Sequence, residues 1–166
     1  MMPGDSRTTL RVASPADAAP LARLRWDFRA QHAEVGEGEP QFIERCGSWM
    51  ATHLVDATRW LCVIAEDAST GNIAGAAWVQ YVEKLPNPTD DEPELHAYIT
   101  SVYVQPSARG GTGTKLLEAL LAHVDARGVD SVFLWPTERS RSLYLRSGFR
   151  GAGSLGVMER RLTESV

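Results

Sequence analysis

The chain is 166 residues long, with 43% hydrophobic and 23% charged residues and with 14 glycines and 9 prolines. This length suits one domain with a substantial core, and this composition excludes disordered, collagen-like and coiled-coil proteins. The formal net charge is −4, from 17 Lys and Arg against 21 Asp and Glu. The chain therefore lacks the basic excess that nucleic-acid binding needs.

Cysteine content and hydropathy define the expected compartment. Cys46 and Cys62 form neither a disulfide framework nor a zinc-binding pattern, so no metal is expected. The longest uninterrupted apolar run, residues 60–65, is far shorter than the roughly 20 residues needed to span a bilayer. Residues 1–6 lack the apolar segment of a secretion signal. We therefore expect a flexible N-terminus at 1–6, a single domain at 7–166, a cytoplasmic location and no membrane partner.

The first half of the chain is expected to hold a strand, two helices and a hairpin. A strand over 7–13 is followed by Ser14 and Pro15, which are typical of a helix N-cap and first helical position, and this predicts a helix over 15–30. Residues 32–40 hold two glycines, a proline and three glutamates, which indicates a loop. A second helix is expected over 41–55. Strands over 60–66 and 73–82 flank turn-forming residues and predict an antiparallel hairpin.

The second half begins with a proline-rich acidic loop over 85–94. A strand over 96–105 then leads through a glycine-rich stretch into a helix over 115–127, whose leucines recur at helical spacing. A short strand over 131–135, a short helix over 138–147 and two short strands within 148–162 follow. The expected fold is α/β (α+β), with a mixed, mostly antiparallel sheet of about seven strands and about four helices on its faces.

The glycine-rich stretch carries the chemistry. Three glycines fall within four positions between a strand and a helix, where free backbone N–H groups can bind phosphate. Arg109 adds a positive charge at the rim of this loop. A phosphorylated cofactor is therefore indicated, although glycines that only make a tight turn are the alternative. A Walker loop is absent, and Gly111-Thr-Gly113 lacks the third glycine of a dinucleotide-binding fingerprint.

Two motifs resemble those of the GNAT-type N-acetyltransferases. The first is Val104-Gln-Pro106, followed by Arg109, Gly111-Thr-Gly113 and an apolar helix. The second, Leu143-Tyr144-Leu-Arg-Ser-Gly148-Phe149, is similar to the family pattern L-Y-x-x-x-G-F. The likeness extends over nearly the whole chain. One departure is that Ala108 stands where the family carries Gln or Arg, so that Arg109 follows one residue late.

The resemblance implies an acetyl-CoA-dependent N-acetyltransferase that moves an acetyl group directly to a primary amine in a ternary complex, with acetyl-CoA as cosubstrate. It also implies a splayed pair of parallel strands, ending at Pro106 and Trp135, whose free backbone groups hold the pantetheine arm and stabilise the oxyanion. The implied cofactor-binding residues are Val102, Tyr103, Val104, Arg109, Gly110, Gly111, Thr112, Gly113, Thr114, Thr137, Ser140 and Tyr144.

Three further roles are expected. Tyr144 is the residue that the family uses to protonate the leaving thiolate, and its hydroxyl is still protonated at neutral pH. His96 has a suitable intrinsic pKa for a general base, and Glu94 could act through water, although a structural histidine and a water chain are the alternatives. Strict strand alternation places His96, Tyr98 and Thr100 on the side of Val102 and Val104. The expected acceptor-binding residues are Glu34, Glu37, Glu39 and Tyr98.

Other functions remain open at this stage. A non-catalytic acyl-CoA-binding regulatory domain would keep the same fold, whereas a generic nucleotide-binding protein would not need the second motif. The acceptor is an amine on a small molecule or a peptide. Dimers are common in families that resemble this one, so a homodimer is one expectation.

Overall fold

The computed structural model describes residues 8–31, 34, 36–89 and 91–151. It divides the chain into two compact units, the first ending at Trp135 and the second beginning at Pro136. The first contains a sheet and three α-helices, and the second contains one short helix, α4 (Arg141–Arg146).

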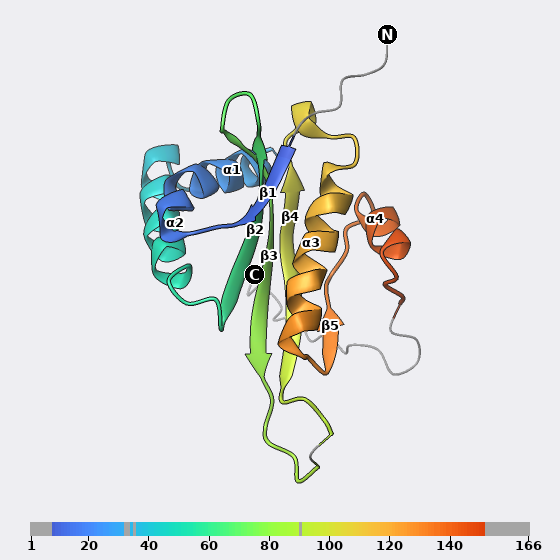
Figure 1. The fold of residues 1–166 in the computed structure, drawn as a ribbon. Helices are drawn as coiled ribbons and strands as arrows, with labels where there is room; N and C mark the ends of the chain where they lie inside the picture. The colour runs from blue at the N-terminus through green and yellow to red at the C-terminus, as the bar shows by residue number, and fades with distance from the viewer. Residues whose placement is uncertain (1–7, 32–33, 35, 90, 152–166) are drawn as a thin grey trace, which may run out of the picture. The chain divides into compact units, whose positions relative to one another are not determined.

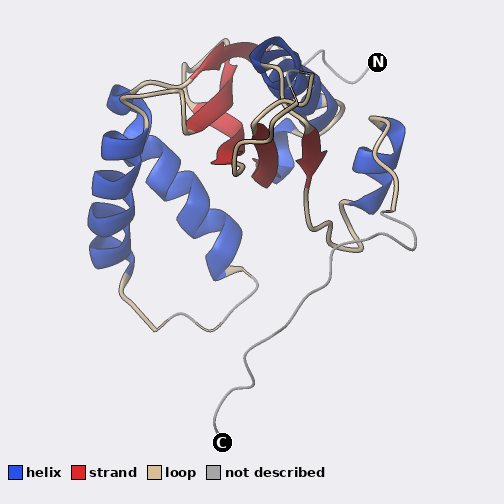
Figure 2. Ribbon diagram, turned by 90° about the horizontal axis from the view of Figure 1, so that it is seen from below, coloured by secondary structure: helices blue, strands red, loops and turns tan. Residues whose placement is uncertain are grey.

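The sheet of the first unit has five strands in the spatial order β1-β2-β3-β4-β5. Neighbouring strands from β1 to β4 are antiparallel, whereas β4 and β5 are parallel. Helices α1 and α2 pack side by side on one face, and α3 covers the other (Figures 1 and 2). The elements are β1 (Thr8–Val12), α1 (Ala18–Ala30), α2 (Glu39–His53), β2 (Trp60–Asp67), β3 (Ile73–Glu83), β4 (Leu95–Val104), α3 (Thr112–Arg127) and β5 (Ser131–Phe133), with short 3-10 turns at Pro15–Asp17 and Pro106–Ala108.

The order of the described elements confirms the sequence prediction, but the count of seven strands is not matched. The described residues form five strands and four α-helices. The two further strands were expected within 148–162, where residues 148–151 are not in a strand and the rest lie outside the described residues. Helix α3 also begins at Thr112, three residues earlier than expected, because the helix includes Gly113.

Both faces of the central strand β3 are buried, and its side chains alternate between two layers. Ala76 and Trp78 belong to the core under α1 and α2, together with Leu21 and Met50. On the opposite face, α3 presents its buried side chains Leu116, Leu117, Leu120 and Val124, which are fully enclosed. Complete burial of one such aliphatic side chain stabilises a fold by about 1.5–3 kcal/mol, so these two layers fix the sheet on which the site is built.

Candidate active site

Strand β4 contains one extra residue where it pairs with β3. Ala76 lies opposite Tyr103 and Trp78 lies opposite Thr100, so two steps along β3 correspond to three along β4. Within this segment Ser101 has a φ of 52°, the one positive φ outside glycine in the described part of the chain. This is a β-bulge, and a bulge reverses the alternation of the side chains that follow it.

The contacts beyond the bulge show this reversal. Tyr103 stacks on Phe28 of α1 with ring centroids 4.7 Å apart, so it faces α1. Val104 faces the other way, because its Cγ2 and the Cδ1 of Leu116 in α3 both lie within 3.2 Å of the position that a Cβ on Gly75 would take. The prediction that Val104 shares a side with Tyr98 and Thr100 is therefore wrong, since strict alternation ignores the inserted residue.

The parallel pairing of β4 with β5 is short. It joins residues His96–Tyr98 of β4 to Ser131–Phe133 of β5 and goes no further within the described residues. Beyond Tyr98, β3 is the only described strand that pairs with β4. Backbone groups of β4 on the β5 side therefore lack a strand partner where a cofactor arm is expected to bind.

The loop after β4 provides a row of free amides. Gly110 and Gly111 have φ values of 117° and 102°, a region that favours glycine, and Gly111 is the N-cap of α3. The first helical hydrogen bond is donated by the N–H of Lys115 to the carbonyl of Gly111. For the N–H groups of residues 110–114 we find no acceptor among the described residues. Free N–H groups at a helix N-terminus are able to bind an anion such as phosphate, and the cofactor role of this loop stays a prediction.

The side chains of this loop have distinct positions. Thr112 is buried, and its hydroxyl donates a 2.7 Å hydrogen bond to the carbonyl of Ala108, so it braces the loop. Arg109 is exposed beside the glycines. Gly113 lies in the first turn of α3 and not in the loop itself, and its φ is not positive. The absence of a side chain at Gly113 would instead let a ligand come close to the backbone. A Cβ at Gly110 or Gly111 would meet no atom of the described residues within 4 Å, so the loop is open where these Cβ atoms would stand.

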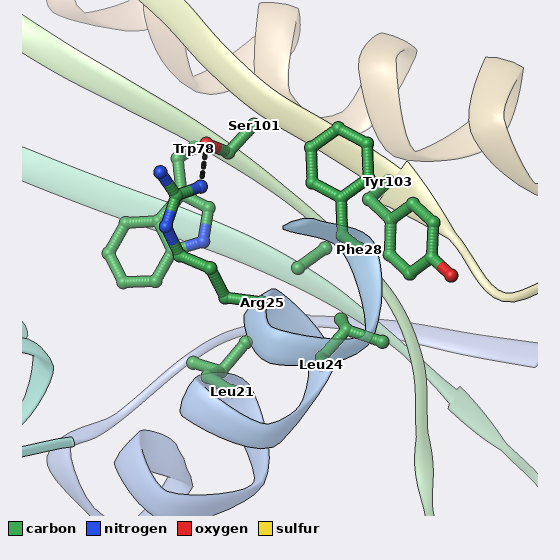
Figure 3. Close-up of a pocket in the computed structure, with 8 residues that line it drawn as sticks. Leu21, Leu24, Arg25, Phe28, Trp78, Ser101 and Tyr103 are labelled. Carbon is green, nitrogen blue, oxygen red and sulfur yellow. Dashed lines mark hydrogen bonds between the residues drawn. The ribbon is translucent and has the colours of Figure 1, made fainter. Parts of the chain in front are cut away.

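A cavity of about 670 Å³ lies in the first unit, between β4 and the helices α1 and α2. Its walls combine residues from both helices and from β2, β3 and the bulged segment of β4. A smaller hollow of about 20 Å³ adjoins it and shares Arg25, Trp78 and Ser101 (Figure 3). The lining residues of the larger cavity are Arg25, Phe42, Arg45, Cys46, Trp49, Met50, Trp60, Trp78, Tyr98, Thr100 and Ser101.

Three tryptophans dominate this wall. Trp49 of α2 meets Trp60 of β2 edge to face, with centroids 5.1 Å apart, and Trp78 of β3 lies 6.3 and 6.4 Å from these two rings. Tyr98 contributes a further ring, stacked on Phe133 of β5 at 5.4 Å. The expected acceptor-binding residue Tyr98 is therefore in the cavity. The tryptophans could be assigned from the sequence only as core or pocket wall, because rings far apart in the chain give no local pattern.

Two arginines are the only charged groups that the described residues contribute to the cavity wall. Arg45 is exposed and pairs with Glu37, with 2.7 Å between Nη2 and Oε2. Arg25 is partly buried, and burial lowers the pKa of its guanidinium. Its Nη1 donates a 2.7 Å hydrogen bond to the Oγ of Ser101 at the bulge, as Figure 3 shows. No described carboxylate lies within ion-pair distance of Arg25.

The acidic loop residues lie outside this lining. Glu37 pairs with Arg45, whose hydrogen bond lowers the pKa of that carboxyl, and Glu39 pairs with Arg23. Glu34 is exposed. Two of the three charges are therefore compensated by arginines, and the acceptor-binding role of the three glutamates stays a prediction.

The expected general bases lie at the opposite end of β4. The Nδ1 of His96 is 2.7 Å from the Oγ of Ser131, where β5 begins, and 3.8 Å from the carboxylate of Asp130. Six residues of strand separate His96 from Val102, which corresponds to roughly 20 Å. Glu94 directly precedes β4 and is exposed. The structure brings neither residue to the cavity.

The second unit holds three of the predicted cofactor residues. Thr137 and Ser140 hydrogen-bond to each other through their hydroxyls, 2.9 Å apart, and each hydroxyl also accepts the other's backbone N–H. These bonds close the turn that precedes α4. Tyr144 lies in α4, is buried, and meets Phe149 edge to face at 5.7 Å. Its catalytic role stays a prediction.

The described residues contain neither a candidate metal site nor a candidate membrane-spanning helix. No group of three or more His, Cys, Asp or Glu side chains there could hold a metal ion. Likewise, none of the helices formed by the described residues is both long and apolar enough to cross a bilayer.

Comparisons with known proteins identify the family. A model of the acetyltransferase (GNAT) family matches residues 21–149. The chain therefore belongs to the GNAT acetyltransferase family, and the resemblance inferred from its two motifs is confirmed. A comparison with curated proteins found no match.

Solved structures support the same fold. A GCN5-related N-acetyltransferase from Ralstonia eutropha is 21% identical with a TM-score of 0.74, over 93% of this chain and 98% of that one. A predicted acetyltransferase with acetyl-CoA from Clostridium acetobutylicum is 21% identical with a TM-score of 0.76, over 95% and 98%. Glucosamine-6-phosphate N-acetyltransferase from Arabidopsis thaliana is 18% identical with a TM-score of 0.67, over 95% and 99%. At these identities the likeness establishes the fold alone.

Proposed function

We propose that this protein is an acetyl-CoA-dependent N-acetyltransferase that acts on a primary amine by direct transfer in a ternary complex. The observation that carries the proposal is the run of free amides at residues 110–114, which directly follows the strand that loses its β5 partner. Free amides at a helix N-terminus suit a pyrophosphate group, and a Cβ on Gly110 or Gly111 would meet no atom of the described residues within 4 Å. Arg109 adds one exposed positive charge.

In this proposal the free backbone of residues 102–104 binds the pantetheine arm as an added strand, and one N–H there stabilises the oxyanion. The deprotonated amine forms a C–N bond with the thioester carbonyl carbon, and the C–S bond then breaks. Tyr144 donates its phenolic proton to the departing thiolate. Water accepts the proton that the amine loses. Thr137 and Ser140 form the polar end of the helix that carries Tyr144 and contribute hydroxyls toward the cofactor.

We further propose that residues 7–166 work as one acetyltransferase domain in the cytoplasm. The acceptor is the amine of a small molecule or peptide. Assembly as a homodimer is consistent with this function, and sedimentation of the purified protein would test it.

The primary test is release of free coenzyme A thiol with acetyl-CoA and a broad amine panel, with acetylated product verified by mass spectrometry. Tyr144→Phe should lower kcat by about 10²–10⁴-fold while acetyl-CoA affinity changes by less than about tenfold, because only the proton donor is removed. Tyr81→Phe is the matched control, since Tyr81 is a buried tyrosine that contacts Arg127 of α3. Turnover of a folded Tyr144→Phe protein within a few-fold of wild type would exclude Tyr144 as the acid.

A protein that binds acetyl-CoA without turning over any amine would instead be a non-catalytic acyl-CoA-binding domain. Calorimetric titration with acetyl-CoA, beside ATP and NAD as controls, separates that outcome from a failure to bind the cofactor at all.

A further inference from the structure

We infer that the acceptor carries a carboxylate close to its amine and a large apolar side chain, as an aromatic α-amino acid does. Arg25 binds the carboxylate, and Trp49, Trp60 and Trp78 enclose the side chain. The inference rests on the proposed function, because it names the substrate class of the same site.

The first support is the charge of the cavity. Among the described residues, the two charged ones that line it are both arginines, and none of the described Asp, Glu or Lys residues does. A polycationic acceptor would place its ammonium groups against like charge in a partly desolvated space, which is unfavourable. An acceptor with one carboxylate would instead place a negative charge beside these arginines, which is favourable.

The second support is the state of Arg25. A guanidinium has five N–H donors, and among the described residues Arg25 makes one side-chain hydrogen bond, to Ser101. The other arginine of the lining, Arg45, already has Glu37 as its partner. Arg25 is therefore the cation of this cavity that is able to receive a ligand carboxylate. A single guanidinium matches a single carboxylate, whose two oxygens suit its planar pair of donors.

The third support is the shape and chemistry of the wall. The three tryptophans line a cavity of about 670 Å³, which is in the range of small-molecule sites, and His53 covers one face of the Trp49 ring at 3.9 Å. Aromatic rings pack favourably against one another in edge-to-face and offset arrangements. A phenyl or indolyl group is therefore a better occupant of this wall than a sugar or an aliphatic polyamine.

The fourth support is the distance between carboxylate site and reaction site. Arg25 is anchored on Ser101, and the backbone expected to hold the thioester begins at the next residue, Val102. One to three residues of strand span about 3–10 Å. An amine one carbon away from the carboxylate therefore reaches the thioester carbonyl while Arg25 holds the carboxylate. This geometry favours an α-amino acid over an acceptor whose amine and carboxylate are far apart.

The experiment compares matched amines by thiol release. L-phenylalanine and L-tryptophan are tested against phenethylamine, which lacks the carboxylate, against glycine, which lacks the side chain, and against spermidine as a polycation. Phenylalanine should exceed both glycine and phenethylamine in kcat/KM by about tenfold or more, since charge-assisted hydrogen bonds are the stronger class. Spermidine as the best acceptor would overturn the inference.

Variants assign the effect to Arg25. Arg25→Gln should lower kcat/KM for phenylalanine about 10- to 100-fold and leave that for phenethylamine within about threefold, so the preference for the carboxylate disappears. The ratio of the two kcat/KM values is compared between variant and wild type, so the difference in basicity between the two amines cancels. Arg25→Lys should restore part of the preference. Arg29→Gln removes an equal charge from an exposed position one turn further along α1 and should keep the ratio. Equal loss for both amines would show that Arg25 has only a structural role.

Two further measurements keep the inference separate from the proposed function. If no amine releases thiol, the proposed function fails, and calorimetric binding of phenylalanine to wild type and Arg25→Gln still tests the site. Tight binding that the variant loses supports the carboxylate site, and absence of binding to wild type overturns it. If Arg25→Gln does not fold, the comparison of phenylalanine with phenethylamine on wild type decides.

Discussion

Replacing Gly75 by alanine tests how strictly the packing holds β4 in place. A Cβ on Gly75 would lie 3.0 Å from the backbone oxygen of Tyr103, 3.1 Å from the Cδ1 of Leu116 and 3.2 Å from the Cγ2 of Val104. Leu116 is fully buried, and the nearest atom belongs to the backbone of β4, so no flexible side chain can move away. Overpacking of this kind costs about 1–3 kcal/mol.

The assay combines unfolding with kinetics. For a chain of this length, 1 kcal/mol shifts Tm by about 2–4 °C, so Gly75→Ala should lower Tm by roughly 3–10 °C. Displacement of the Tyr103 carbonyl should also lower kcat/KM for acetyl-CoA, because this segment of β4 is the proposed cofactor strand.

A second glycine gives a control with the opposite sign. Gly47 lies inside α2, and a Cβ there would make only ordinary contacts of 3.9–4.0 Å with the start of α1. Gly47→Ala should therefore stabilise the protein by about 0.5–1 kcal/mol, the usual advantage of alanine in a helix. A Gly75→Ala protein as stable as Gly47→Ala would refute the claim that the β3, β4 and α3 layers are tightly fitted here.

Three further predictions concern the loop and the N-terminal ion pair. Gly111→Ala should cost about 1–2 kcal/mol of stability because its φ is 102°, and it should weaken acetyl-CoA binding about tenfold; unchanged calorimetric affinity in the folded variant would remove the phosphate role of the loop. Thr112→Val should lose about 1 kcal/mol in urea unfolding, because it leaves the carbonyl of Ala108 unpaired. The hydrogen bond from Arg11 lowers the pKa of Asp17 from 3.8 to about 2. This pair therefore stabilises the fold above about pH 4 and loses its contribution as pH falls to 2, so Asp17→Asn should flatten that part of the stability curve; an equally steep curve would contradict the assignment.

Much of the first unit could be predicted from the chain alone, because its elements have clear periods and stops. The hairpin of β2 and β3 is flanked by turn residues, and α3 has four buried positions at helical spacing before Gly128, whose φ of 70° ends the helix. The glycine loop was likewise visible, since three glycines in four positions are rarely found without a structural demand. Local signals of this kind depend only on neighbouring residues.

The cavity was not predictable in the same way. Arg25 lies on α1 between buried Leu24 and partly buried Phe28, and nothing in that pattern tells whether its guanidinium turns to solvent or toward β4. Its partner Ser101 is 76 residues away. The bulge at Ser101 also has no glycine to mark it, so alternation was extended through β4 without interruption. Both features depend on tertiary contacts, which single-sequence patterns do not contain.

The inserted residue in β4 has a consequence for comparing this chain with its relatives. Before Ser101 the even-numbered residues Tyr98 and Thr100 line the cavity, and after it the odd-numbered Tyr103 lines the adjoining hollow. A homologue without the insertion would place a tyrosine equivalent to Tyr103 in the leucine layer of α3 and a valine against Phe28, which would bury a phenolic hydroxyl among aliphatic groups. The alternation of side chains along this strand is therefore shifted by one residue at Ser101. Alignments of β4 should be built separately on each side of Ser101, because a single gap placed elsewhere would assign cavity positions to the core.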